Sequence, residues 1–349
     1  MRITVELGER SYDVVLGAGT LGELAALVRQ RAPQARIAAI VTSAALRDQP
    51  WFNIDAGIDH DVIEVPEGEA AKSLVALGDL CERLAGLSLS RRDVVVAVGG
   101  GAVTDLAGFA AAVYLRGVAL VQVPTSIAGQ VDAAIGGKTA VNLRAGKNLV
   151  GAFHQPLGVL CDFDTLSTLP ERERVSGLGE VAKCWLLEGR RAGDLEGVPI
   201  EDLIELSVRL KATIVSSDEV EGGDRALLNY GHTLGHALEA LALERADGDL
   251  RHGEAVAVGL CFAARLAHRL GRVGPDVVAN HDDVVMALGL SSRLAPYATT
   301  TEVLNVMARD KKAHHDLTFV LAGARGFDVV RGVDAGVVAE VLESFRGER

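Results

Sequence analysis

Apolar and polar residues follow two different patterns along the chain, and the pattern changes near residue 160. Before that point, short apolar runs typical of strands alternate with segments in which apolar residues recur every three or four positions, as in helices. The almost wholly apolar runs suit strands that are covered on both faces, as in a parallel sheet. The expected strands are a pair within 2–16 and single strands at 37–42, 62–65, 93–98 and 119–123, and the expected helices are 21–30, 73–87 and 104–115.

Helical patterns dominate the rest of the chain. The expected helices are 173–187, 200–219, 227–243, 254–270 and 282–288. We therefore expect an α/β domain at 1–160 followed by a mostly α-helical domain at 161–349. A cleft between two such domains is the usual place for a ligand.

Composition narrows the class of protein. The net charge of −12 argues against general nucleic-acid affinity. No apolar run is long enough to cross a bilayer, and the first ten residues have the pattern of a strand rather than of a signal peptide. The four cysteines lie far apart and form no CxxC pair, which suits a reducing compartment. We therefore expect a cytoplasmic enzyme with a small-molecule substrate and with no nucleic-acid or membrane partner.

Lysine is rare in this chain. The sequence has 28 arginines but only seven lysines. An ammonium group is a compact point charge that a guanidinium cannot replace at every site, so lysine is expected where that group is specifically needed. The alternative is codon bias with chance survivors. The lysines are Lys72, Lys138, Lys147, Lys183, Lys211, Lys311 and Lys312.

A glycine-rich loop follows one of the apolar runs. Residues 93–105 read DVVVAVGGGAVTD, which is a strand, three glycines and the start of a helix. Backbone N–H groups in such a loop can approach a phosphate closely, and the helix N-terminus favours negative charge. The loop differs from the G-x-G-x-x-G fingerprint, and a mere tight turn is the alternative. Asp105 suits either a carboxylate that interacts with the helix dipole or a ligand contact.

Two histidines lie one helical turn apart. Residues 229–239 read NYGHTLGHALE, so His232 and His236 share one helical face. A threonine follows His232, which excludes the HExxH metalloprotease motif. Alone, two such histidines are more often structural than metal-binding.

Two further segments supply the remaining metal-ligand types. Residues 251–254 read RHGE and contain His252, and residues 177–183 read GLGEVAK and contain Glu180 and Lys183. One carboxylate and two imidazoles from three helices suit a catalytic zinc site with an open position. The alternative is that Glu180 and Lys183 form a surface ion pair.

Taken together, these motifs resemble one family. Residues 99–156 contain GGGAVTDLAGFAAAVYLRG, VPTSIAGQVDAAIGGKTAVN and GKNLVGAFHQP, and TLPERE, GLGEVAK, LNYGHTLGHALE, RHGEAVAVGL and DKK follow. The chain resembles 3-dehydroquinate synthases over nearly its whole length. The resemblance implies a Rossmann-like NAD-binding domain at 1–160, a helical metal-binding domain at 161–349, and a homodimer.

The resemblance also implies roles for individual residues. The metal, zinc or cobalt, would be bound by Glu180, His232 and His252. Arg116 would reach into the partner subunit's site. The substrate would contact Asp132, Lys138, Lys147, Asn148, Lys183, Lys211, Arg225, Asn229, His236 and one or both of Lys311 and Lys312. NAD would contact Glu69, Lys72, Gly100, Gly101, Asp105, Thr125, Ser126, Thr165, Thr168 and Glu173.

The implied activity is the second step of the shikimate pathway. Enzymes of this family convert 3-deoxy-D-arabino-heptulosonate 7-phosphate to 3-dehydroquinate and phosphate. They do so by transient oxidation with NAD, β-elimination of phosphate, re-reduction and intramolecular aldol closure, and the leaving phosphate can serve as the base. A substrate with a phosphate and a carboxylate accounts for the set of lysines.

Several alternatives remain at this stage. A sister cyclase that makes aminodehydroquinate has almost the same site, whereas those that make inosose or valiolone usually alter the GGKT and KN-x-x-G-x-F-x-Q-P segments, which are intact here. A glycerol-dehydrogenase-like oxidoreductase and a non-catalytic homologue are more remote. The chain departs from the common family pattern at Ser43, Ser126, Ala140 and residues 313–315.

Overall fold

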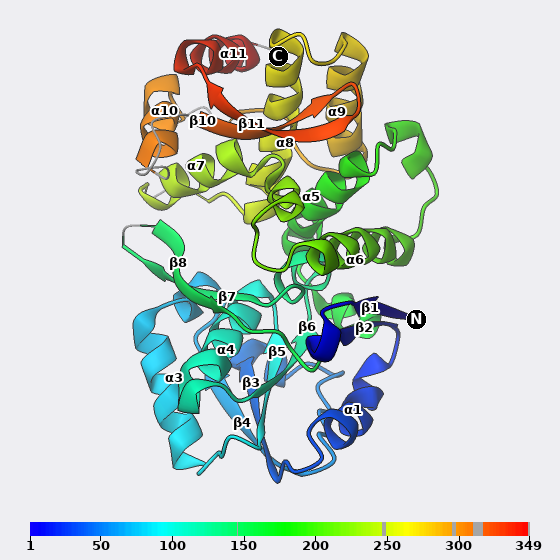
Figure 1. Cartoon of the computed structure of the whole chain (residues 1–349), viewed down its shortest axis with the longest axis vertical. Coiled ribbons are helices and arrows are strands. Elements are labelled where there is room, and N and C mark those ends of the chain that lie inside the picture. Colours follow the sequence, from blue (N-terminus) through cyan, green and yellow to red (C-terminus); the bar gives the residue numbers. More distant parts are fainter. Residues whose placement is uncertain (145, 246–248, 295–297, 310–316, 348–349) are drawn as a thin grey trace. The chain divides into compact units, whose positions relative to one another are not determined.

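The computed structural model describes residues 1–144, 146–245, 249–294, 298–309 and 317–347 (Figure 1). The chain forms two compact units. The first contains Met1–Pro170 and Ser207–Val220, and the second contains Glu171–Leu206 and Glu221–Arg349. Helix α6 (Ile200–Ser217) therefore contributes residues to both units. The domain limits of 1–160 and 161–349 remain a prediction.

The first unit contains a seven-stranded sheet in the order β1-β2-β9-β6-β5-β3-β4. Only β1 pairs antiparallel with its neighbour, and every other adjacent pair is parallel. The expected strands are thereby confirmed as parts of an α/β fold. The strands are β1 (Arg2–Val5), β2 (Tyr12–Gly17), β3 (Ile37–Ser43), β4 (Asp59–Val65), β5 (Val94–Gly99), β6 (Ala119–Pro124) and β9 (Gly158–Asp162).

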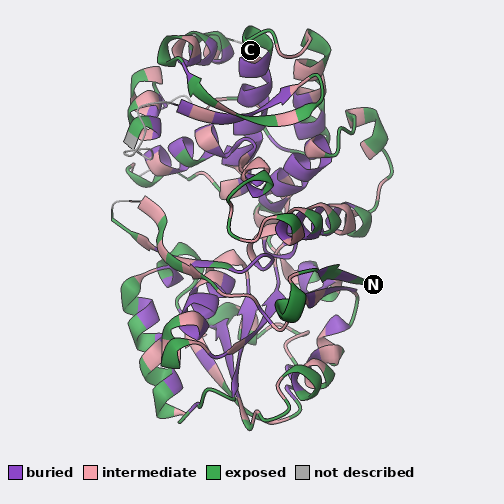
Figure 2. Ribbon diagram, in the orientation of Figure 1, coloured by how far each residue is buried: buried purple, intermediate pink, exposed green. Residues whose placement is uncertain are grey.

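Helices cover both faces of this sheet. Helices α3 (Leu74–Gly86) and α4 (Gly101–Val113) pack on the face that carries Ala39 and Val41 of β3. Helix α1 (Leu24–Arg31) packs on the opposite face, which carries Ala38 and Ile40. The central strands are accordingly buried along their length (Figure 2). Burial on both faces explains why these strands are apolar throughout rather than alternating.

The glycine loop lies where the order of the strands reverses. Strand β3 is flanked by β4 on one side and by β5 on the other, so the chain switches direction across the sheet between β3 and β5. In open α/β sheets, ligands bind at the carboxyl ends of the strands at such a point. Helix α4 begins at Gly101 rather than at 104, because the tight turn leads directly from β5 into the helix. A Cβ atom on Gly99 would lie 2.6 Å from the Cβ of Val103, so this turn requires glycine.

Apart from its short 3₁₀ and π segments, the first unit has four elements that were not expected from the sequence. Two are the short helix α2 (Ala44–Arg47) and the sheet strand β9. The others are β7 (Lys138–Leu143) and β8 (Gly146–Phe153), which form an antiparallel hairpin. This hairpin carries Lys138, Lys147 and Asn148 of the predicted substrate set.

The second unit is mostly helical, as expected. Helix α8 (His252–Arg269) contacts α5, α7, α9, α11 and β10, and its first half is buried on nearly all sides. Helix α9 begins at Pro275 rather than at 282, because proline suits the first turn of a helix. The other elements are α5 (Glu171–Leu187), α7 (His232–Leu243), α9 (Pro275–Ala287), α10 (Thr300–Arg309), α11 (Ala335–Gly347) and the hairpin of β10 (Leu317–Gly323) and β11 (Gly326–Val333).

Within the part of the chain that the structure describes, none of the helices combines the length and apolar character required of a membrane span.

Candidate active site

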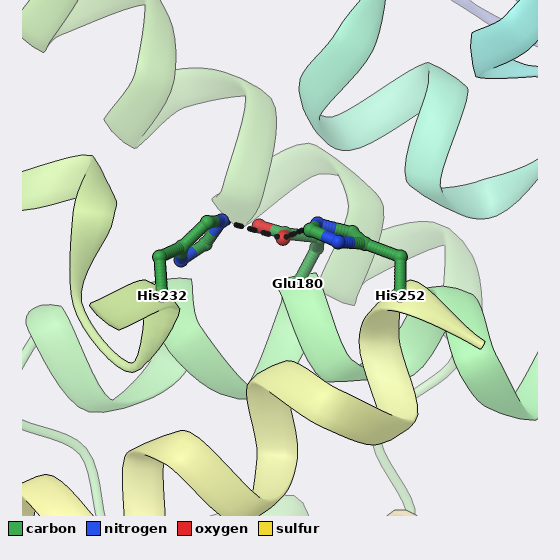
Figure 3. Close-up of side chains that lie close together, drawn as sticks. All are labelled: Glu180, His232 and His252. Atoms are coloured by element: carbon green, nitrogen blue, oxygen red, sulfur yellow. Dashed lines mark hydrogen bonds and ion pairs between the residues drawn. The ribbon is translucent and has the colours of Figure 1, made fainter. Parts of the chain in front are cut away.

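One carboxylate and two imidazoles converge within the second unit (Figure 3). Glu180 lies on α5, and His232 and His252 are the first residues of α7 and α8. The Oε1 atom of Glu180 lies 3.3 Å from Nε2 of His232 and 3.0 Å from Nε2 of His252. Ligand atoms bound to a tetrahedral zinc ion lie about 3.3 Å apart, so these spacings suit a metal site. The structure brings together the three residues predicted as ligands.

Glycines bring the three helices close enough for this convergence. A Cβ atom on Gly179 would lie 2.2 Å from the carbonyl oxygen of Gly253, so α5 and α8 touch backbone to backbone. Gly179 directly precedes Glu180, and Gly253 directly follows His252. At the start of α7, Gly231 adopts φ +78°, a conformation that favours glycine. Larger residues at these positions would move the ligands apart.

Each histidine directs its Nε2 atom toward Glu180 through a hydrogen bond at its other nitrogen. Nδ1 of His232 lies 3.0 Å from the carbonyl oxygen of Tyr230, and Nδ1 of His252 lies 3.0 Å from Oε2 of Glu239. When Nδ1 donates to these oxygens, Nε2 is left with a lone pair for a metal. In their neutral forms, both rings are therefore held in the tautomer that a metal site requires.

Charge in this group is balanced inside the protein. The side chains of Glu180 and Lys183 form an ion pair and are each only 1% exposed, so the predicted alternative of a surface pair is wrong. Burial opposes ionisation, but Lys183 and the two histidines hold the pKa of Glu180 well below its usual range. For His252, burial lowers the pKa, but hydrogen bonds to Glu180 and Glu239 outweigh it and raise the pKa to about 10. Glu180 is thus an anion at neutral pH and available to a cation.

Three more predicted substrate residues belong to the second unit. The ring of His236 is exposed and lies 5.2 Å from the ring of His232 between centroids. Arg225 is buried to 1% exposure, and Asn229 donates a hydrogen bond of 2.7 Å to Glu221. Glu173, predicted to contact NAD, forms an ion pair of 2.7 Å with Arg251.

In the first unit, Lys72 links residues of the two predicted sets. Its Nζ atom pairs with Asp105 and donates a hydrogen bond of 2.5 Å to Oδ1 of Asn148. Burial raises the pKa of Asp105, although Lys72 opposes this shift. Lys72 is only 8% exposed, and its two partners hold the ammonium group in place. The structure thereby joins a residue predicted for the substrate to two predicted for NAD.

Other predicted residues of the first unit also lie in pairs. Lys211 on α6 donates a hydrogen bond of 2.5 Å to Oδ1 of Asp132. The Nζ atom of Lys147 lies 3.4 Å from Oε1 of Glu69. Lys138 is exposed on the hairpin, and Arg116 is exposed after α4.

The remaining predicted NAD contacts follow three strands. Gly100 caps α4, and a Cβ atom there would lie 3.4 Å from Oγ of Ser126. Thr125 donates its backbone N–H to Gly99. Thr165 is buried and donates its hydroxyl to Asp162, whereas Thr168 accepts a hydrogen bond from Trp51.

Lys311 and Lys312 lie outside the described residues. Glu239 was not singled out from the sequence. Its position seven residues after His232, which places it two turns along the same helical face, is the signal that could have identified it.

Two sequence models of 3-dehydroquinate synthases match adjoining parts of the chain. The model of the N-terminal part matches residues 62–176, and the model of the C-terminal part matches residues 177–313.

Individual proteins are similar over most of the chain. A protein of Amycolatopsis mediterranei (strain S699) named "putative aminodehydroquinate synthase" is 49% identical over 341 residues, which cover 98% of this chain and 93% of that protein. A 3-dehydroquinate synthase of Thermobifida fusca (strain YX) is 45% identical over 308 residues, which cover 84% of this chain and 82% of that protein. Among solved structures, ValA, a 2-epi-5-epi-valiolone synthase from Streptomyces hygroscopicus subsp. jinggangensis 5008 with NAD+ and Zn2+ bound, has a TM-score of 0.83 at 27% identity and covers 98% of both chains.

Proposed function

Since this chain belongs to the 3-dehydroquinate synthase family, we propose that it converts 3-deoxy-D-arabino-heptulosonate 7-phosphate to 3-dehydroquinate and phosphate, using NAD and a divalent metal ion. The observation that carries the proposal is the convergence of Glu180, His232 and His252 in a chain 45% identical to a 3-dehydroquinate synthase. Family membership agrees with the resemblance drawn from the motifs.

The metal ion, zinc or cobalt, would be held by Glu180 Oε1 and by Nε2 of His232 and His252. When bound there, it would lower the pKa of a coordinated substrate alcohol and so assist oxidation. Lys183, buried beside Glu180, offsets the carboxylate charge and offers a cation next to that alcohol. Three protein ligands leave a position for substrate, as in other catalytic zinc sites.

NAD would bind on the first unit. The cofactor would accept a hydride from the substrate and return it later, so it would be regenerated in each turnover. The loop at Gly100 and Gly101 would hold its pyrophosphate at the N-terminus of α4, where backbone N–H groups favour an anion. Lys72 and Asp105, which form an ion pair with each other, would also contact the cofactor.

The substrate's two anionic groups require several cations. The proposed set comprises Lys138, Lys147, Lys183, Lys211, Arg225, Lys311 and Lys312, with Asp132, Asn148, Asn229 and His236 as hydrogen-bonding partners. Lys211 holds the Asp132 carboxylate in place, which fixes the orientation of both groups. Since the leaving phosphate is itself basic, it can take the proton adjacent to the new ketone.

We also propose a homodimer in which Arg116 reaches the partner's site. Leu115 and Arg116 have φ values of +49° and +66°, which L-residues rarely adopt. Such strain is typically retained where the backbone must present a side chain for function. Arg116 is exposed and thus available to a second subunit.

A second candidate function is aminodehydroquinate synthase. It is favoured by the 49% identity to the Amycolatopsis relative, over nearly the full length of both proteins. The substrate would then be the amino analogue of the heptulosonate phosphate, and the proposed metal and NAD sites would be unchanged.

One experiment tests both candidates. Purified protein is incubated with NAD, zinc and either the heptulosonate phosphate or its amino analogue, and kcat/KM for phosphate release is measured on each, with products identified by mass spectrometry. We expect 3-dehydroquinate from the first substrate at the higher kcat/KM, and no product from Glu180→Ala. A higher kcat/KM for the amino analogue would favour the second function, and phosphate release from neither would contradict both.

A further inference from the structure

Glu239 is a buried carboxylate that lies against one of the proposed metal ligands. It is 3% exposed and lies on α7, two turns after His232. Its Oε2 atom is 3.0 Å from Nδ1 of His252, and Nε2 of the same ring is 3.0 Å from Oε1 of Glu180. The imidazole of His252 is therefore held between two buried carboxylates on two different helices.

We infer that Glu239 is a positioning residue for the metal ion, acting through His252. A ring nitrogen that donates to a carboxylate fixes both the tautomer and the orientation of the imidazole, and makes its other nitrogen a stronger ligand. Glu239 would thereby keep Nε2 of His252 directed at the metal position. This inference rests on the proposed function, because it requires a metal at Glu180, His232 and His252.

The two histidines differ in a way that explains why only one needs a carboxylate. The side chain of His232 is 10% exposed, so packing already restricts its ring, and its Nδ1 meets the neutral carbonyl of Tyr230. The side chain of His252 is 39% exposed and starts its helix, so packing restricts it less. A charge-assisted hydrogen bond is stronger than one to a carbonyl. The stronger hydrogen bond, to Glu239, therefore acts on His252, whose ring is less restricted by packing.

Glu239 and His252 also belong to a second group of side chains that could bind a metal ion. His236, Glu239 and His252 also offer atoms that all lie within 4.8 Å of one another, so Glu239 could itself ligate an ion. That ion would need Nδ1 of His252 without its proton. The hydrogen-bond distance to Glu239 favours a proton on Nδ1, and hence one ion per chain.

The test measures metal binding rather than activity. Metal-free wild type and Glu239→Gln are titrated with zinc against a chelator, and the visible absorption of the cobalt forms is recorded. Glu244→Gln is the matched control, since Glu244 is an exposed residue at the end of the same helix. We expect zinc affinity to fall about 10- to 100-fold in Glu239→Gln, with an altered cobalt spectrum, and to stay unchanged in Glu244→Gln.

Thermal melting of the metal-free proteins separates positioning from a structural role. If Glu239→Gln does not fold, Glu239→Asp keeps the charge but shortens the reach, and the same loss of affinity is expected. Wild-type affinity and spectrum in the folded variant would overturn the inference, as would two ions in wild type and one in Glu239→Gln. A wild type that binds no zinc would instead contradict the proposed function.

Discussion

The α carbon of Gly253 lies so close to Ser176 that a Cβ atom added to it would be 1.6 Å from the Ser176 carbonyl oxygen. This contact joins α8 to α5 one residue beyond His252 and four residues before Glu180. Any side chain at position 253 must push apart the helices that carry these two ligands.

Gly253→Ala is therefore expected to destabilise the fold and weaken metal binding together. Overpacking typically costs about 1–3 kcal/mol, and we expect the upper end here because backbone cannot rotate away as a side chain can. Urea denaturation gives the free energy of unfolding, and chelator competition gives the zinc affinity. Gly78→Ala on α3 is the control: its Cβ would meet nothing within 4 Å, so we expect slightly higher stability. Wild-type stability in Gly253→Ala would contradict the close approach.

Glu180 and Lys183 are expected to depend on each other. Both side chains are 1% exposed, so replacing either partner removes an opposite charge from beside a buried charged group. In the metal-free protein, Glu180→Gln and Lys183→Met should each lower the free energy of unfolding by about 3–5 kcal/mol. The double variant should lose clearly less than the sum, and urea denaturation of all four proteins measures the difference. Additive losses would contradict a coupled buried pair.

Metal binding should strengthen as the pH rises. The pKa of His252 is raised to about 10, so a metal ion must displace a proton from this ring at neutral pH. The apparent dissociation constant for zinc is therefore expected to fall about tenfold for each pH unit in this range. Chelator competition at pH 6.5, 7.5 and 8.5 measures it. An affinity that does not change with pH would contradict the protonated state of His252.

His281 predicts a loss of stability in mild acid. Burial lowers its pKa from 6.5 to about 4, and its Nε2 lies 2.6 Å from the Tyr230 hydroxyl. Between pH 6.5 and 4 the unfolded chain binds a proton that the folded protein does not. The contribution of neutral His281 to the free energy of unfolding is thus present in full above pH 6.5. It is lost as the pH falls toward 4, by about 3 kcal/mol at most.

Urea denaturation from pH 7 to 4.5 tests this dependence with two variants. His281→Gln should remove part of the slope, whereas His268→Gln, at an exposed histidine of α8, should retain it. An equal slope in both variants would assign the acid sensitivity to other groups.

Much of the fold could be predicted because its signals are local. The apolar runs of β5 and β6 and the helical periodicity of α3 and α5 each depend on neighbours in sequence. The hairpins β7–β8 and β10–β11 were missed because their pairing depends on turns and on packing rather than on a long apolar run. The start of α9 was placed too late, although Pro275 marks it.

Less of the candidate site could be predicted from local sequence patterns. The spacing of His232 and His252 along the chain says nothing of their distance in space, and the contacts at Gly179 and Gly253 that bring them together were not recognised in the sequence. The resemblance to a family supplied the ligand set, whereas Glu239 was identified from its contact with His252.

The most direct test of the central claim counts phosphate and NADH in the same reaction. The protein is incubated with the heptulosonate phosphate, zinc and a limiting amount of NAD. We predict that phosphate released exceeds the NAD supplied many times over, that 3-dehydroquinate forms in equal amount, and that no NADH accumulates. NADH that accumulates in step with consumed substrate, without phosphate release, would contradict the account and indicate a simple dehydrogenase.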